Sequence, residues 1–219
     1  MLDTIKNLIF SKRNYCPLCG ENKVNKPNHI CKSCGEVIEI SHRELDLNSI
    51  YIEEAYSSCT YNRIMRDQLH KFKFGGKSYL YQGFGEILIY TIEETELKDK
   101  IDAITFVPMH KKRKGQRGYN QSELLAQYVA KNLNLPLLDK HIVKHKWTVE
   151  QNKLGRAERK VNLIDSFKAI NIEDIKGKEI LIIDDIITTG ATMEECGKTL
   201  MEAGAKTVYG LCLVSSRKL

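Results

Sequence analysis

Residues 180–192 read ILIIDDIITTGAT and combine residue types of opposite chemistry. Four aliphatic residues lead into Asp184 and Asp185, and threonines then surround Gly190 at the start of an expected helix over residues 192–203. Backbone N–H groups at a helix start bind phosphate, whereas carboxylates repel phosphate and accept hydrogen bonds from hydroxyl groups. A ligand that suits both must carry a phosphate at one end and hydroxyl groups farther along. The segment therefore predicts a site for a ribose 5-phosphate.

The segment also has features of a P-loop magnesium site and of an ordinary core strand. An apolar strand that ends in two aspartates also occurs at the magnesium site of P-loop NTPases, and residues 74–78 read FGGKS. The P-loop pattern G-x-x-x-x-G-K-[ST] needs its first glycine at position 71, which is Lys71 here. An ordinary core strand followed by a capped helix would leave the adjacent aspartates and the threonine-rich turn without a role. The sugar phosphate site is the interpretation that uses every residue type in the segment.

A second group of residues with ligand chemistry lies near the N-terminus. Two C-x-x-C pairs are separated by eleven residues, and a glycine follows each pair. Thiolates at this spacing can meet one tetrahedral zinc ion in a closed, structural site, and the repeated spacing argues against two redox-active pairs. We expect a structural zinc ribbon over about residues 15–40 that needs the metal to fold. The expected zinc ligands are Cys16, Cys19, Cys31 and Cys34.

The elements that must position these residues alternate between strand and helix patterns. Helices between apolar strands indicate an α/β domain with a largely parallel sheet, in which ligands bind at the carboxyl ends of the strands. We expect an N-terminal helix and four-cysteine segment over residues 1–42 and the α/β domain over residues 43–219. The expected strands are 51–57, 101–107, 137–141, 166–170, 179–183 and 206–214, and the expected helices are 62–72, 78–96, 120–133 and 192–203.

The composition is that of a soluble globular protein. Hydrophobic residues make up 42% of the 219 residues and charged residues 28%, which suffices for one ordinary domain and a small addition. No apolar run reaches the ~18 residues of a membrane helix, and the N-terminus lacks the pattern of a secretory signal. A cytoplasmic protein without membrane insertion is therefore expected. The net charge of +6 permits an anionic partner without requiring one.

Several segments together resemble the ComF family, which includes ComFC-like competence proteins. Residues 180–192 are similar to the phosphoribosyl pyrophosphate (PRPP) motif of type I phosphoribosyltransferases. The paired C-x-x-C segments and RGYNQ at 117–121, where the family usually has RGFNQ, follow the family's order over nearly the whole chain. The resemblance implies a type I phosphoribosyltransferase fold with a small N-terminal zinc ribbon. The other similar segments are LHKFKFGGK at 69–77, VPMHKKRKGQRGYNQSELLA at 107–126 and TVEQNKLGRAERKVNLIDSF at 148–167.

The resemblance also implies roles for particular residues. Asp184 and Asp185 would hold the ribose hydroxyls as catalytic residues, and a loop after an earlier strand would bind the pyrophosphate with Mg²⁺. The reaction would be displacement at the anomeric carbon through an oxocarbenium-like state, with pyrophosphate leaving. The PRPP loop would be Ile186, Ile187, Thr188, Thr189, Gly190, Ala191 and Thr192, the pyrophosphate loop Met109, His110 and Lys111, and a flexible loop over the site Gln151, Arg156 and Arg159.

Two functions from different classes follow from the resemblance. The first is a PRPP-binding protein of natural transformation that contacts incoming single-stranded DNA or other DNA-uptake proteins. The second is a metabolic phosphoribosyltransferase that makes a nucleotide from PRPP and a free base; the zinc ribbon and RGYNQ favour the first, because a salvage enzyme needs neither. The acceptor, and whether PRPP is turned over, stay open. The DNA candidates are Lys112, Arg113, Lys114, Arg117 and Tyr119, with Trp147 and Tyr15 as further rings, although pyrophosphate binding and packing explain the same residues.

Overall fold

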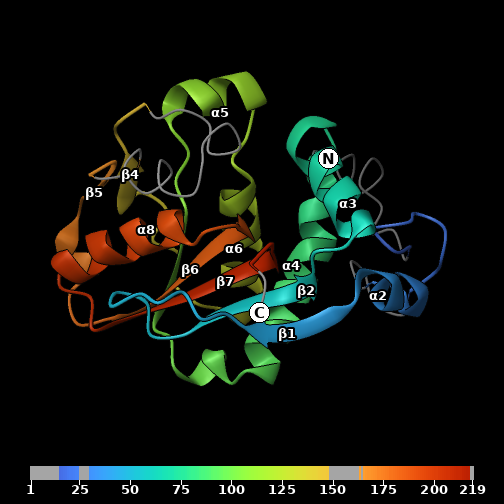
Figure 1. Cartoon of the computed structure of the whole chain (residues 1–219), viewed down its shortest axis with the longest axis horizontal. Coiled ribbons are helices and arrows are strands. Elements are labelled where there is room, and N and C mark those ends of the chain that lie inside the picture. Colours follow the sequence, from blue (N-terminus) through green and yellow to red (C-terminus); the bar gives the residue numbers. More distant parts are fainter. Residues whose placement is uncertain (1–14, 25–29, 148–162, 164, 218–219) are drawn as a thin grey trace, which may run out of the picture.

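A computed structural model describes residues 15–24, 30–147, 163 and 165–217 (Figure 1). The expected N-terminal helix lies outside these residues, and so do Gln151, Arg156 and Arg159 of the expected flexible loop. No helix among the described residues has the length and apolar character needed to cross a bilayer.

A five-stranded sheet with the order β1-β2-β7-β6-β3 forms the centre of the structure. Strands β2, β7, β6 and β3 run parallel to one another, and only β1 pairs antiparallel, with β2. The largely parallel sheet expected from the sequence is confirmed. The strands are β1 (Ile40–Glu44), β2 (Ala55–Thr60), β3 (Ala103–Phe106), β6 (Glu179–Ile187) and β7 (Thr207–Ser215).

Helices cover both faces of this sheet. Along β6, Leu181 and Ile183 pack into one apolar cluster, and Ile180 and Ile182 pack into another on the opposite face. A parallel strand buried on both faces needs such an unbroken apolar run, which explains the sequence that precedes the aspartates. The first cluster lies under α3 (Arg63–Phe74), α4 (Tyr81–Glu94) and α6 (Gln121–Leu133), and the second lies under α8 (Ala191–Glu202).

Smaller elements complete the described part of the chain. A two-stranded antiparallel sheet of β4 (Ile142–Lys144) and β5 (Phe167–Ala169) lies beside α8. Helix α5 (Lys111–Arg117) follows the loop after β3 and projects from the body at the top of Figure 1. Helix α2 (Lys32–Ile38) begins directly after Cys31 in the cysteine segment. Short 3₁₀ turns occur at Ser78–Leu80, Leu97–Asp99 and Ile172–Asp174.

The cysteine segment packs against the main domain. Pro17 lies so close to Gly83 of α4 that a Cβ atom at Gly83 would be 2.6 Å from the Pro17 Cγ atom. Asn62 joins α2 to α3: its Oδ1 atom accepts from the Met65 N–H at 2.9 Å and caps α3, while its Nδ2 group donates to the Val37 carbonyl at 3.0 Å. The expected boundary between residues 42 and 43 falls inside β1, and the division into two domains stays a prediction.

The structure corrects several expected elements. Strand β6 runs to Ile187 instead of ending at residue 183, because its parallel pairing with β7 continues to the partners Ile187 and Ser215. The aspartates therefore lie within the strand. The expected strand over 51–57 forms at 55–60, and the one over 137–141 is replaced by a single bridge between Leu137 and Ile104. Helix α5 was not expected, because its basic sequence has no buried apolar residues that would give a helical period. The His110 side chain caps its start.

Candidate functional site

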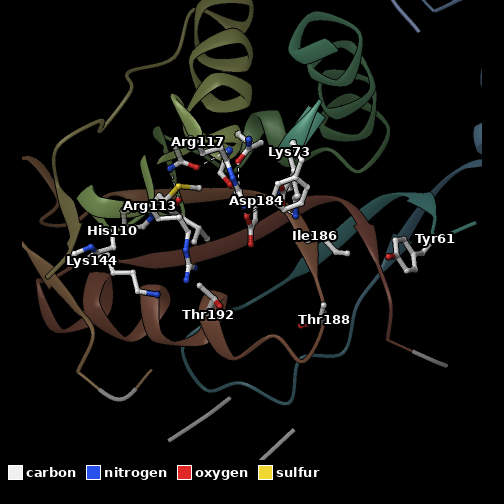
Figure 2. A pocket seen from close by; sticks show the side chains of 18 residues that line it. Tyr61, Lys73, His110, Arg113, Arg117, Lys144, Asp184, Ile186, Thr188 and Thr192 are labelled. Atoms are coloured by element: carbon white, nitrogen blue, oxygen red, sulfur yellow. Dashed lines mark hydrogen bonds and ion pairs between the residues drawn. The ribbon is translucent and has the colours of Figure 1, made fainter. Parts of the chain in front are cut away.

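A cavity of about 410 Å³ opens at the carboxyl ends of β3 and β6. Figure 2 shows Asp184 in the middle of its lining, with His110, Arg113 and Lys144 to one side and Tyr61 and Thr188 to the other. This volume is within the usual range for small-molecule sites. The sheet thus brings together three segments that the sequence marked separately: the acidic pair, the loop after β3 and the threonine-rich turn after β6.

The two aspartates are held by partners from different helices. Ser122 of α6 donates from Oγ to the Asp184 Oδ1 atom at 2.7 Å, and the same oxygen accepts from the Asp185 backbone N–H at 2.9 Å. Lys73 of α3 pairs with Asp185, with 2.9 Å between Nζ and Oδ1. Burial, and then the charge of Asp185, raise the pKa of Asp184 to about 7. Asp184 can therefore gain or lose a proton near neutral pH.

The RGYNQ segment builds the support for this pair. The Asn120 Nδ2 group donates to the Val107 carbonyl after β3 at 3.0 Å, and its Oδ1 atom caps α6 by accepting from the Ser122 N–H at 3.2 Å. The Tyr119 hydroxyl donates to the Phe72 carbonyl at the end of α3. This segment therefore ties β3, α3 and α6 together around the aspartates, and it places Ser122 beside Asp184.

A turn at Gly190 joins β6 to α8. Gly190 has a φ of +87°, which favours glycine, and α8 begins at the next residue. Thr188 and Thr192 line the main cavity, and a small hollow beside it is lined by the turn itself. Not every expected ligand-binding side chain points there. Ile187 and Ala191 pack into the apolar core, so they can offer a ligand only their backbone groups.

One side of the cavity is cationic. His110 of the expected pyrophosphate loop lines it with Met109, whereas Lys111 begins α5 and is absent from the lining. Lys144 of β4 also lines it, and burial, followed by the nearby charge of Arg113, lowers its pKa to about 8. Overall the lining has four cationic side chains, namely Lys73, Arg113, Arg117 and Lys144, against two carboxylates. This balance favours an anionic ligand.

Sequence reasoning missed Lys73 and Lys144. No spacing in the sequence relates either lysine to residues 184 and 185. Lys73 does lie in the segment LHKFKFGGK that carries part of the family resemblance, which was the one available signal. Their place in the site depends on how α3 and β4 pack around the end of β6.

The nucleic-acid candidates separate into two groups. Lys112 and Arg113 flank Trp147, with 5.9 Å from Nζ and 5.5 Å from Cζ to the ring, and Trp147 is 50% exposed. The others are engaged within the fold. Lys114 pairs with Glu123 of α6, Arg117 lies over the Phe74 ring at 4.7 Å, and Tyr119 packs against Phe72. The first group is the better placed to meet a partner.

The four cysteines gather as the sequence predicts. Their sulfur atoms lie within 4.8 Å of one another, and those of Cys19 and Cys31 are 4.0 Å apart. The Asn22 Nδ2 group donates to the Cys31 sulfur at 3.3 Å. Four thiolates in this arrangement can hold a metal ion, and zinc suits an all-sulfur tetrahedral set.

Replacing Asp184 by asparagine should stabilise the folded chain more at pH 8 than at pH 5. Because folding raises the pKa of Asp184 from 3.8 to about 7, the folded chain binds its proton more tightly, and stability falls as the pH rises through this window. Asparagine keeps the acceptor for Ser122 without the charge, and the gain at pH 8 should be about 1–3 kcal/mol. Urea unfolding at both pH values measures it.

The control is Asp67→Asn on the exposed side of α3, which should change stability little at either pH. Equal stability of Asp184→Asn and the wild-type chain at pH 8 would contradict the raised pKa.

Comparison with known proteins finds relatives over most of the chain. The family described as "Phosphoribosyl transferase domain" matches residues 120–218. "Competence protein F" of Haemophilus influenzae is 26% identical over 215 residues, 94% of this chain and 93% of that protein. "Competence protein ComFC" of Bacillus subtilis is 29% identical over 202 residues, 92% of this chain and 78% of that protein.

A third relative has a different name. "DNA utilization protein YhgH" of Shigella flexneri is 30% identical over 149 residues, 66% of this chain and 64% of that protein. The chain is therefore a homologue of the ComF, ComFC and YhgH proteins, with the type I phosphoribosyltransferase fold and the clustered cysteines that its sequence predicts.

Proposed function

We propose that the cavity binds PRPP together with Mg²⁺. The observation that carries this proposal is the meeting of the acidic pair, the threonine-rich turn and four cationic side chains around one small-molecule cavity. The 5-phosphate would lie on the turn at 188–192, and the ribose hydroxyls would donate to Asp184 and Asp185. The pyrophosphate would then face the loop at 108–110 and Lys144.

The residues around the acidic pair fit a magnesium-bound polyanion. When bound, Mg²⁺ neutralises part of the pyrophosphate charge, and oxygen ligands such as carboxylates suit it. Lys73 forms an ion pair with Asp185, which is only 5% exposed, and so supplies a cation beside this carboxylate. Arg113 and Lys144 contribute positive charge where a leaving pyrophosphate would develop negative charge. The cavity can thus support displacement at the anomeric carbon, although binding alone uses the same residues.

The relatives' names favour a role in competence. Two are called competence proteins and one a DNA utilization protein, and the chain aligns with the competence proteins over more than nine tenths of its length. We place the PRPP site in this context, as part of the uptake and handling of transforming DNA. A base-specific salvage enzyme is the alternative.

Single-stranded DNA contact fits α5 and the neighbouring Trp147. Lys111 and Lys112 are exposed at the start of α5, and the half-exposed Trp147 ring lies beside Lys112 and Arg113. Cations beside an accessible aromatic ring suit a phosphate backbone with unstacked bases. The patch adjoins the cavity, because Arg113 belongs to both. We propose other DNA-uptake proteins as further partners of the same surface.

Changing both Asp184 and Asp185 to asparagine should abolish PRPP binding and preserve the fold. The amides cannot replace the two charged acceptors for the ribose hydroxyls and Mg²⁺, so affinity should fall by about a hundredfold or more. Isothermal titration of Mg²⁺-PRPP measures this loss. The double variant Asp67→Asn with Asp174→Asn removes equal charge at exposed positions and should bind normally.

Unchanged PRPP affinity in the Asp184 and Asp185 double variant would contradict the assignment of PRPP to this cavity. A screen of free bases with PRPP and Mg²⁺, which monitors pyrophosphate release, separates the two functions. Robust turnover with one base would support the salvage enzyme over the competence role.

Lys112→Glu combined with Trp147→Ala should weaken binding of single-stranded DNA by about tenfold or more at low salt. The change removes a stacking ring and reverses one phosphate-facing charge, so the salt dependence of the remaining binding should also decrease. Fluorescence anisotropy with a labelled oligonucleotide at two salt concentrations is the measurement. Lys98→Glu, an exposed lysine far from the cavity, is the matched charge control. A wild-type chain that binds no DNA at low salt rules out direct contact.

The reduced protein should contain one zinc ion per chain, and removal of the metal should lower its thermal stability. The cysteine segment packs through Pro17 on α4, so its loss would also expose apolar surface. Metal analysis and thermal unfolding before and after chelation test this. Cys31→Ser should lose the metal, whereas Cys59→Ala, a buried cysteine outside the cluster, should retain it. Less than one zinc per wild-type chain would count against the site.

A further inference from the structure

The segment after β7 is bound to the turn that follows β6. The Ser216 backbone N–H donates to the Ile187 carbonyl at 3.0 Å, at the end of β6. The next residue, Arg217, donates from Nη1 to the Thr189 carbonyl at 2.7 Å. Two consecutive residues after β7 therefore hold both ends of the short stretch that leads to Gly190 and α8.

Arg217 is itself fixed at several points. Its backbone N–H donates to the Oγ atom of the buried Ser215 at 3.2 Å, and its carbonyl accepts from Nη2 of Arg43 at 3.2 Å. The guanidinium group also lies against Gly190, where an added Cβ atom would be 3.2 Å from Nη1 and 3.2 Å from the Leu47 Cδ2 atom. Because Arg217 is already held in place, it can fix the conformation of the turn before a ligand binds, and the ordering of the turn then costs little entropy on binding.

The contact with Thr189 determines how the following peptide group points. In a trans peptide the carbonyl and the N–H group point in opposite directions. Since the Thr189 carbonyl is directed toward Arg217, the Gly190 N–H is directed away from it. Gly190 also lines the small hollow formed by the turn, whereas Arg217 lines neither this hollow nor the main cavity. Arg217 therefore acts on the ligand side of the turn through the peptide group between Thr189 and Gly190.

The charge of Arg217 adds to this effect. A guanidinium group stays protonated at any physiological pH, and here it is bonded to the turn that lines the small hollow without lining that hollow itself. It polarises the Thr189–Gly190 peptide in the sense that makes its N–H group a stronger donor. The start of α8 adds its own positive potential on the same side.

We propose that Arg217 is a positioning residue for the ligand's terminal phosphate, because it fixes the Thr189–Gly190 peptide with its N–H group turned toward the bound phosphate. The inference rests on the proposed function and deepens it. It assigns part of the preference for a 5-phosphate to a residue outside the 180–192 motif. It also requires that loss of the Arg217 side chain lower the affinity for a sugar phosphate but leave unchanged the affinity for pyrophosphate bound at the other side of the cavity.

Isothermal titration of the full chain with ribose 5-phosphate and, separately, with magnesium pyrophosphate tests the inference. Arg217→Ala should weaken ribose 5-phosphate binding by about tenfold or more, as expected for a lost charge-assisted contact, and should change pyrophosphate affinity by less than about twofold. Arg217→Lys keeps a charged donor and should recover most of the lost affinity. Arg66→Ala, an exposed arginine on α3, should match the wild-type chain for both ligands.

The outcomes separate this inference from the function on which it rests. Wild-type ribose 5-phosphate affinity in Arg217→Ala contradicts the inference alone, and so does an equal loss for both ligands, which would indicate general damage to the fold or charge. Failure of the wild-type chain to bind ribose 5-phosphate or PRPP contradicts the proposed function, and the inference with it. Thermal unfolding of each variant shows whether the folded state is retained, and recovery with lysine distinguishes positioning from simple structural support.

Discussion

Two adjacent carboxylates inside one cavity are the constraint around which the site is organised. Asp184 and Asp185 repel each other where little water reaches them, so each needs a partner within the fold. Ser122 supplies one from α6 and Lys73 supplies the other from α3. The end of α3 and the start of α6 must therefore lie near the same part of β6. The fold meets this requirement and leaves the outer side of the pair open to a ligand.

The anchoring of α3 follows from the same requirement, since this helix carries Lys73. At its start, Asn62 caps the helix and also donates to the Val37 carbonyl of the cysteine segment. At its end, the Phe72 carbonyl accepts from Tyr119 of the RGYNQ segment. A metal-bound cysteine segment would thus brace the helix that neutralises Asp185. This gives the N-terminal segment a physical connection to the cavity even where it touches no ligand.

The cavity itself has two kinds of surface that suit the two ends of one molecule. The turn at 188–192 offers backbone donors beside hydroxyl groups, and the opposite side offers His110, Arg113 and Lys144. Between them lie carboxylates that would repel phosphate but accept from sugar hydroxyls. A sugar with a phosphate at each end would suit both of these surfaces and the carboxylates between them, which is why we propose PRPP as the ligand and not a simple polyanion. The exposed Trp147 beside Arg113 extends this chemistry outward along α5.

The amino-acid sequence alone determined the local features. The apolar run before Asp184 predicted a buried parallel strand, the paired C-x-x-C segments predicted the sulfur cluster, and Gly190 marked the turn before α8. These features depend on neighbours in the chain, where residue type and period carry the information. The continuation of β6 to Ile187 could not be predicted from neighbouring residues, because it depends on pairing with β7.

Only the tertiary structure decided which distant side chains complete the site. Lys73, Lys144 and Arg217 are ordinary cationic residues in sequence, and each acquires its role from packing against the end of β6 or the turn after it. Tyr119 was a candidate for stacking on DNA bases, but the same packing places its ring beside Phe72 within the fold. Long-range contacts of this kind have no period or spacing in the chain, because they are fixed by the order of strands and the docking of helices.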